Sequence, residues 1–487
     1  MTSLVSRLKN AFAKSHFANP DSAARHVSLI AGGTVIAQAV GILTIPIVSR
    51  IYSPADYGIM AVFASVIAIL GELSGFRYYL AIPLPKDERY AKALVVLSLG
   101  LQIAFVALLA LLLFFAGEYL LTKLSMPELI PYRALIPLGL LATGTFMVLT
   151  QWAIREKLFS TIARTKITQS LSGAVAKIGL GLLGVRPLGL LIGTIVAQGG
   201  GITTLLRSLL KKKGVPRPAR EDVRRAALRY RKFPMYSTWS GLLNTLGRQI
   251  VPILLIAFYD TNIVGLFALS MHMLQLPVSF IGQAIAQVFI QKASVAKRQG
   301  SLPQLTVRTF EFLLHISALP MLTIAILAPD LFAFLLGERW RMAGLFSQLL
   351  APWIFFMFLL SPITGLFSVL EKQYQDLLFN LVNIAGRIGS IFLGYYLFEN
   401  PTYSVFFYGL FSVLFVLAII FWLFKTASIP RAAITLLISN FAIRLLPFAL
   451  AIATILLTLP RNFFTLILAT ALIFIHFLVH LKTLKTR

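Results

Sequence analysis

The stretch AKALVVLSLGLQIAFVALLALLLFFA, residues 91–116, contains a single charged residue, Lys92. A helix of about 20 apolar residues crosses the hydrocarbon core of a bilayer, so this stretch predicts a membrane-spanning helix. The rest of the chain has a similar composition, because 58% of its residues are hydrophobic and 13% are charged. That balance lies outside the range of soluble domains. The sequence therefore predicts an all-α polytopic membrane protein.

Apolar runs separated by polar breaks predict about fourteen transmembrane helices along the chain. We place them at residues 27–49, 58–82, 91–116, 133–153, 167–184, 187–208, 234–258, 262–290, 307–328, 343–369, 375–397, 402–424, 441–459 and 462–480. These spans use up most of the chain, so they leave no room for a sizeable soluble domain. Cysteine is absent, which excludes disulfides and thiol chemistry.

Basic residues outnumber acidic ones, with 44 Lys and Arg against 17 Asp and Glu and a net charge of +27. With the N-terminus placed in the cytoplasm, about 32 basic residues fall in inside segments and about 7 in outside loops. This bias is the positive-inside rule, so the charge does not require a nucleic-acid partner. An even number of spans returns the C-terminus to the cytoplasm as well. We expect a multi-pass protein of the cell inner (cytoplasmic) membrane.

A basic polar segment separates two groups of six spans. The predicted organisation is a cytoplasmic interfacial segment, an N-lobe, a basic cytoplasmic linker, a C-lobe, and two extra C-terminal helices with a cytoplasmic tail, at residues 1–26, 27–210, 211–233, 234–424 and 425–487. Six spans per lobe keep both lobes in the same orientation. The two lobes are then related by a pseudo-two-fold axis along the membrane normal.

Residues that recur at a fixed offset support the two-lobe repeat. An offset of 207 residues pairs Tyr52 with Tyr259 and Gly58 with Gly265. Folds with such repeats bind substrate where the repeats meet and rock about that site.

Matching prolines, Pro46 and Pro252, lie in the first span of each lobe. Proline removes a backbone hydrogen bond and kinks a helix. Both positions are therefore candidate hinges of a transport cycle, and a static kink is the alternative.

The linker at 211–233 also has two interpretations. Its basic residues suit an anchor on the head groups of anionic membrane lipids, or a docking surface for an enzyme partner. Basic cytoplasmic loops are the default in membrane proteins, which favours the anchor. Residues 221–232 predict a short surface helix within the linker.

Three cations lie near the middle of predicted spans: Lys177, Arg248 and Arg387. A charge at the bilayer centre costs about 2.5–3.5 kcal/mol even on the lenient insertion scale. Keeping all three wet, in a cavity rather than in lipid, avoids that cost. Such a cavity suits phosphate, pyrophosphate or acidic sugars.

Further ionisable groups lie in the same spans. Glu72 and His272 have a similar depth, and Arg77 lies closer to the cytoplasmic end of its span, where a long side chain can snorkel. We include Arg77 among the candidate substrate-binding residues. The structural alternative for each cation is an ion pair that locks two helices together. One carboxylate cannot neutralise three cations, which favours the cavity.

No catalytic constellation is visible. The G-x-G-x-x-G pattern at 179–184 lies inside an apolar span with no preceding strand, so it indicates helix packing. His476 and His480 have metal-ligand spacing, but no Glu follows His476, and interfacial packing explains the pair. We expect no catalytic residue, no metal site and no cofactor.

Transport then needs another energy source, because no G-x-x-x-x-G-K-[ST] nucleotide loop is present. We expect a proton or sodium gradient, with Glu72 and His272 as the ion-coupling groups. The alternative is that Glu72 pairs with a neighbouring cation and that His272 is a polar packing residue.

Three motifs resemble a known family: SRIYSPADYG at 49–58, RYYLAIPLPK at 77–86 and LGERW at 336–340. With fourteen spans and the repeat, they are similar to the Wzx-type polysaccharide-biosynthesis flippases of the multidrug/oligosaccharidyl-lipid/polysaccharide exporter superfamily. The resemblance implies translocation of an undecaprenyl-pyrophosphate-linked oligosaccharide, of O-antigen or a similar polymer, from the cytoplasmic to the periplasmic leaflet. It also implies a cationic central cavity. A polysaccharide polymerase or chain-length regulator is an expected partner.

Several alternatives remain open at this point. A lipid II flippase is the nearest, followed by a multidrug/cation antiporter, whose cavity would need acidic rather than basic groups. A polymerase or ligase of the same pathway would act from large periplasmic loops, whereas the predicted outer loops are short. A purely structural scaffold would not need charges at the membrane midplane.

Overall fold

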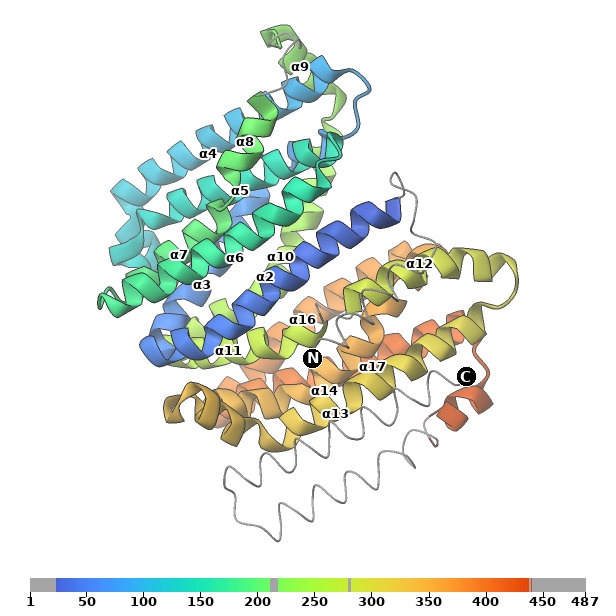
Figure 1. Cartoon of the computed structure of the whole chain (residues 1–487). Coiled ribbons are helices and arrows are strands. Elements are labelled where there is room, and N and C mark those ends of the chain that lie inside the picture. Colours follow the sequence, from blue (N-terminus) through green and yellow to red (C-terminus); the bar gives the residue numbers. More distant parts are fainter. Residues whose placement is uncertain (1–22, 211–217, 279–281, 438, 440–487) are drawn as a thin grey trace, which may run out of the picture. The chain divides into compact units, whose positions relative to one another are not determined.

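The computed structural model describes residues 23–210, 218–278, 282–437 and 439. These residues form a succession of helices, α2 to α17, joined by short turns (Figure 1). Within the described part, ten helical stretches are long and apolar enough to cross a membrane. The chain is an all-α polytopic membrane protein, as its apolar runs predicted.

These ten stretches match ten of the fourteen predicted spans. Two others are helices at the expected places that are too polar or too short for that criterion: α6 (Phe159–Leu182) and α11 (Thr261–Pro277). The predicted span 262–290 is covered by α11, which ends at Pro277, and by the first turns of the more polar α12 (Gln283–Arg298), and residues 279–281 between them lie outside the described part. The last two predicted spans, 441–459 and 462–480, and residues 1–22 of the interfacial segment lie outside the described residues.

The chain forms two compact units, and the first comprises residues 1–52 and 62–249. Its elements are α2 (Ala23–Ile51), most of α3 (Pro54–Ser74), η1 (Tyr78–Ala81), α4 (Glu88–Lys123), η2 (Pro127–Tyr132), α5 (Leu135–Arg155), α6, α7 (Leu188–Gly199), α8 (Ile202–Leu210), α9 (Arg220–Arg229), η3 (Phe233–Ser237) and the first half of α10 (Thr238–Phe258). Within this unit α2 packs along α6, α6 along α7 and α4 along α5.

The second unit comprises residues 53–61 and 250–487. Its described elements are the first turns of α3, the rest of α10, α11, α12, α13 (Leu302–Leu336), η5 (Glu338–Trp340), α14 (Arg341–Ile363), α15 (Leu366–Val369), α16 (Gln373–Phe398) and α17 (Pro401–Thr426). Here α13 lies side by side with α14, and α16 with α17 (Figure 1).

The two units divide the chain at other places than the predicted lobes, 27–210 and 234–424. Residues 234–249 belong to unit 1, because Thr245 and Gln249 bond to side chains of α3. The first turns of α3 belong to unit 2, because they pack against α11 and η5. Polar composition along the chain does not predict which unit these segments join, because that depends on side-chain contacts between helices distant in sequence.

The linker contributes a packed helix to unit 1. The predicted helix at 221–232 is α9 (Arg220–Arg229). The Asp222 Oδ2 lies 2.7 Å from the Arg89 Nε of α4, in an ion pair, and accepts a hydrogen bond from the backbone N–H of Ala219 at 2.7 Å. Ala226 of α9 is fully buried. Residues 211–217 of the linker lie outside the described part.

In unit 2 the structure brings two repeat-related glycines, Gly58 and Gly265, into one helix crossing. A Cβ on Gly58 would overlap the carbonyl oxygen of Thr261, and a Cβ on Gly265 would overlap that of Pro54. Thr261 is the partner of Pro54 at the offset of 207 residues. The contact between α3 and α11 is therefore reciprocal, as expected where equivalent turns of two repeats cross about a two-fold axis.

Candidate functional site

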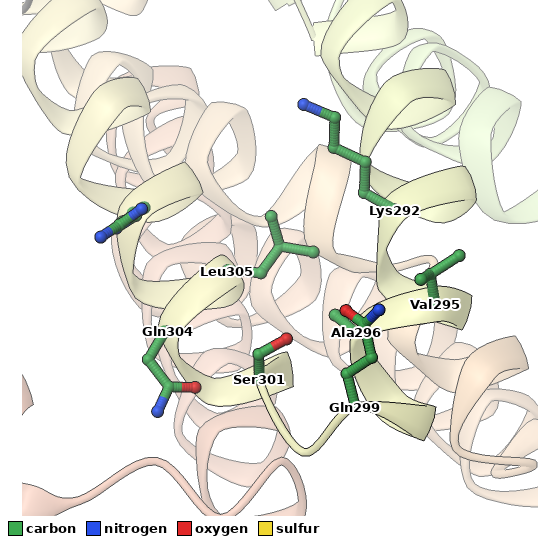
Figure 2. A pocket seen from close by; sticks show the side chains of 8 residues that line it. Lys292, Val295, Ala296, Gln299, Ser301, Gln304 and Leu305 are labelled. Carbon is green, nitrogen blue, oxygen red and sulfur yellow. The ribbon is translucent and has the colours of Figure 1, made fainter.

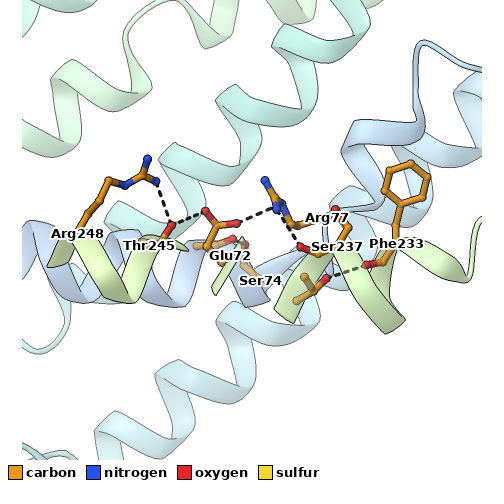
Figure 3. Close-up of polar contacts among 9 residues, drawn as sticks. Glu72, Ser74, Arg77, Phe233, Ser237, Thr245 and Arg248 are labelled. Atoms are coloured by element: carbon orange, nitrogen blue, oxygen red, sulfur yellow. Dashed lines mark hydrogen bonds and ion pairs between the residues drawn. The ribbon is translucent and has the colours of Figure 1, made fainter. Parts of the chain in front are cut away.

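A polar network joins α3 to α10 inside unit 1 (Figure 3). The Glu72 Oε2 lies 3.2 Å from the Arg77 Nε, and the Glu72 Oε1 accepts a hydrogen bond from the Thr245 hydroxyl at 2.8 Å. Arg248 donates from Nη2 to the Thr245 Oγ1 at 3.3 Å. One carboxylate is thus ion-paired with one guanidinium and linked through a hydroxyl to a second.

Local backbone geometry positions Arg77 for this contact. After α3 ends at Ser74, Phe76 and Arg77 adopt the left-handed conformation, with φ of 45° and 54°. Side chains other than glycine adopt it at some cost, so the surrounding contacts must hold it. The Arg77 Nη1 donates to the Ser237 carbonyl oxygen at 2.9 Å. Ser237 is the last residue of η3, a π-helical turn, and such turns are frequent at functional sites.

The network carries a net positive charge. Glu72 supplies one negative charge, whereas Arg77 and Arg248 supply two positive ones. The side chains of Arg77 and Glu72 are 22% and 15% exposed, so water screens their ion pair weakly. Arg248 is exposed on α10, and within the described residues no carboxylate contacts it.

Lys177 lies in α6 and is half-buried. Its aliphatic stem crosses Gly193 of α7, where a Cβ would collide with the lysine Cγ. The Tyr52 hydroxyl donates to the Lys177 carbonyl oxygen at 2.8 Å, which fixes the backbone. In the part of the chain that the structure describes, no carboxylate contacts the Lys177 ammonium group.

Arg387 belongs to unit 2, where two aromatic rings hold it. Its guanidinium carbon lies 5.3 Å from the ring centroid of Trp353 on α14 and 5.7 Å from that of Tyr408 on α17. The two rings meet edge to face at 5.2 Å. Cation–π contacts of this kind stabilise a guanidinium and leave its positive charge in place.

The remaining candidates are the proposed coupling histidine and the two proposed hinge prolines. His272 is exposed on α11. Pro46 lies inside α2 and Pro252 inside α10, and both helices continue past the proline. Among the described residues no group of three His, Cys, Asp or Glu is placed to hold a metal ion. His476 and His480 lie outside that part.

Sequence reasoning missed the neutral partners of these charges, Thr245, Trp353 and Tyr408. The spacing of three residues between Thr245 and Arg248 places both on one face of a helix, and this signal could have been used. The aromatic rings come from two distant helices, so their contact with Arg387 follows from tertiary packing alone.

The first and third motifs meet in unit 2. Tyr57 of the 49–58 motif packs edge-on against Trp340 of the 336–340 motif, with ring centroids 5.0 Å apart, and Trp340 is fully buried. At the start of α3, the Asp56 Oδ2 of its first turn accepts from the backbone N–H of Ser53 at 2.7 Å, and the Ser53 hydroxyl accepts from the backbone N–H of Asp56 at 3.2 Å. This reciprocal cap starts α3.

Two comparisons with known proteins agree on the family and the fold. The family model described as "Polysaccharide biosynthesis protein" matches residues 47–344, more than half of the chain. A lipid II flippase MurJ in an inward closed conformation has a similar structure, with a TM-score of 0.71 at 11% identity over 93% of this chain and 97% of that one.

Multidrug transporters share the fold as well. An inward-facing multidrug resistance MATE family transporter of the MOP superfamily gives a TM-score of 0.64 at 13% identity, over 81% of this chain and 98% of that one. The Vibrio cholerae MATE transporter VcmN in the bent form gives 0.53 at 17% identity, over 83% and 96%. No curated protein sequence matches the chain. The chain belongs to the polysaccharide biosynthesis protein family, whose model covers more than half of it.

Proposed function

We propose that this protein is a flippase for an undecaprenyl-pyrophosphate-linked oligosaccharide, an O-antigen or similar polysaccharide repeat unit. It moves this lipid from the cytoplasmic to the periplasmic leaflet of the cell inner membrane, with both of its own termini in the cytoplasm. Translocation proceeds by alternating access through a cationic central cavity. The family supports a polysaccharide substrate, and the fold is that of membrane transporters.

One observation carries the choice of an anionic substrate: Lys177 and Arg248 lie in membrane helices without a carboxylate partner among the described residues. A buried or lipid-facing cation without an anion is costly, so a site that receives a pyrophosphate or acidic sugar accounts for both. Arg77 and Arg387 complete the proposed substrate-binding set. A polysaccharide polymerase or chain-length regulator is the proposed partner on the product side.

The two alternatives differ in how well the charges suit them. A lipid II flippase is favoured by the TM-score of 0.71 with MurJ, and a basic cavity suits any lipid-linked pyrophosphate. A multidrug/cation antiporter needs a free carboxylate for its cation. Here the Glu72 carboxylate is bonded to Arg77 and Thr245, which disfavours that function.

The test is translocation by purified protein in vesicles. With fluorescent undecaprenyl-pyrophosphate oligosaccharide on one leaflet, we expect protein-dependent movement to the other. Unlabelled oligosaccharide of the same chemistry should compete, and a lipophilic cation should not. Equal competition by lipid II would move the assignment to the lipid II alternative, and competition by the cation alone would refute the proposal.

We also propose that an ion gradient drives transport, with Glu72 and His272 exchanging the coupling ion and Pro46 and Pro252 as hinges. Arrival of a substrate phosphate would compete with Glu72 for Arg77 and free the carboxylate to take a proton. A Glu72→Gln, His272→Ala variant should therefore move substrate without substrate-dependent proton uptake in the same vesicles. Unchanged proton flux in this variant would exclude both residues from coupling. His315→Ala on α13 is the matched control, and its proton flux should equal that of the parent.

A further inference from the structure

A cleft of about 470 Å3 lies between the end of α12 and the start of α13 (Figure 2). The two helices form a hairpin that turns at Gly300, whose φ is 73°. The Lys297 Nζ on α12 donates to the Val369 carbonyl oxygen at the end of α15 at 2.7 Å, which ties the hairpin to the rest of unit 2. The hairpin that forms the cleft is therefore fixed to the rest of unit 2. The cleft is remote in sequence from the cations of the proposed transport site.

Its charged lining is basic. Lys292 comes from α12 and Arg308 from α13, and both side chains are exposed. Among the described residues, no Asp or Glu lines the cleft. The acidic residue nearest along α13 is Glu311, which lies 4.0 Å from the His315 Nε2 and does not line the cleft. Two cations that line one cleft, with no acidic residue in its described lining, favour an anionic ligand.

The remaining lining is amphipathic rather than uniformly polar. Val295 is 43% exposed and lies with Ala296 and Leu305 on the apolar part of the surface. Gln299, Ser301 and Gln304 add neutral hydrogen-bonding groups. A free inorganic anion would make no favourable contact with the apolar part of the lining. A phospholipid would contact all of it, because it carries a phosphate, polar ester groups and an apolar chain in one molecule.

The position along the chain places the cleft at a membrane surface. α13 is a candidate membrane span, and the cleft lies at its first turns. Lys297 and Arg298 end α12 beside it. In the proposed topology this basic hairpin is cytoplasmic, and the cytoplasmic leaflet carries anionic lipids that attract such segments.

We infer that the cleft between α12 and α13 binds the headgroup phosphate of an anionic phospholipid of the cytoplasmic leaflet. Lys292 and Arg308 hold the phosphate, the two glutamines and Ser301 bond its oxygens or the adjoining esters, and Val295 and Leu305 receive the start of an acyl chain. This binding differs from the proposed transport activity, because the lipid stays in its own leaflet and contacts none of the proposed transport cations.

The experiment measures lipid retention by native mass spectrometry on full-length protein extracted in detergent. Parent protein should hold phosphatidylglycerol well above phosphatidylcholine. A Lys292→Gln, Arg308→Gln variant should bind phosphatidylglycerol about thirtyfold more weakly, which corresponds to about 1 kcal/mol for each of two charges. Each single variant should lose about fivefold, which keeps the test valid if the double variant folds poorly.

The matched control is Lys157→Gln, Arg164→Gln, which removes one exposed lysine before α6 and one exposed arginine within it and should keep the parent affinity. Equal retention of the two lipids by parent protein would overturn the inference, and so would unchanged binding by the cleft variants. If inorganic phosphate at millimolar concentration stabilises the parent and not the cleft variant, to the same degree as phosphatidylglycerol, the ligand is a free anion and the lipid assignment is wrong.

Discussion

Replacing Lys177 and Arg248 together by glutamine should lower glycan translocation by roughly a hundredfold, while the protein stays folded in the membrane. Each group offers a charge-assisted bond to the proposed pyrophosphate, worth about 1.5 kcal/mol or more, and about 1.4 kcal/mol is tenfold in affinity or rate. Neither cation has a carboxylate partner among the described residues, so their removal leaves no anion stranded. Translocation in vesicles and melting in detergent measure the two effects separately.

The control keeps charge at both positions. Lys177→Arg with Arg248→Lys should retain most of the activity, because a cavity that needs positive charge tolerates either cation better than neither. Parent-level translocation by the glutamine double variant and by Arg387→Gln would refute the cationic-cavity proposal. Loss of activity that accompanies loss of folded protein would not count in its favour.

Arg77 should behave differently, which separates a binding role from a structural one. Its guanidinium is paired with Glu72 at 3.2 Å, and both side chains are largely buried. Removing one member of such a pair strands the other charge. A variant at Arg77 that loses activity must therefore be compared with a Glu72→Gln, Arg77→Gln variant, in which no charge is stranded.

Much of the fold followed from the sequence because the bilayer allows so few solutions. A run such as residues 91–116 must satisfy its backbone groups internally, and a helix does so. The prediction held even for α6, a span that carries Lys177. It was less accurate at 262–290, where α11 ends at Pro277 and the more polar α12 begins at Gln283, because a continuous run of mostly apolar residues does not show where one helix ends and the next begins.

The candidate site could be predicted from the sequence only in part. Depth in a span identified Glu72, Arg77 and Arg248 as unusual groups, but depth alone does not give partners. The Glu72–Arg77 pair depends on a left-handed turn at Arg77, and Thr245 links it to Arg248 because α10 crosses α3 at that level. Hydropathy contains no information on the rotation of one helix against another, so the network could be found only in three dimensions.

Alanine at Gly58 or at Gly265 should each destabilise the folded protein by about 2–3 kcal/mol, toward the upper end of the cost of overpacking. The new methyl group would meet a backbone carbonyl, that of Thr261 or of Pro54, and a backbone carbonyl cannot rotate aside as a side chain can. The first turns of α3 and α11 must then separate. Gly100→Ala is the control, because nothing lies within 4 Å of a Cβ at that position of α4.

The double variant tests whether the crossing acts as one unit. If either methyl group already forces α3 and α11 apart, the second enters space that the first has opened, so the combined loss should be clearly smaller than the sum of the single losses. Two independent packing defects would instead add. Equal melting temperatures for Gly58→Ala, Gly265→Ala and the Gly100→Ala control would show that the close approach is absent in solution. Non-additivity would tie the repeat in the sequence to a single physical contact, since the same offset of 207 residues relates both glycines and both opposing carbonyl groups.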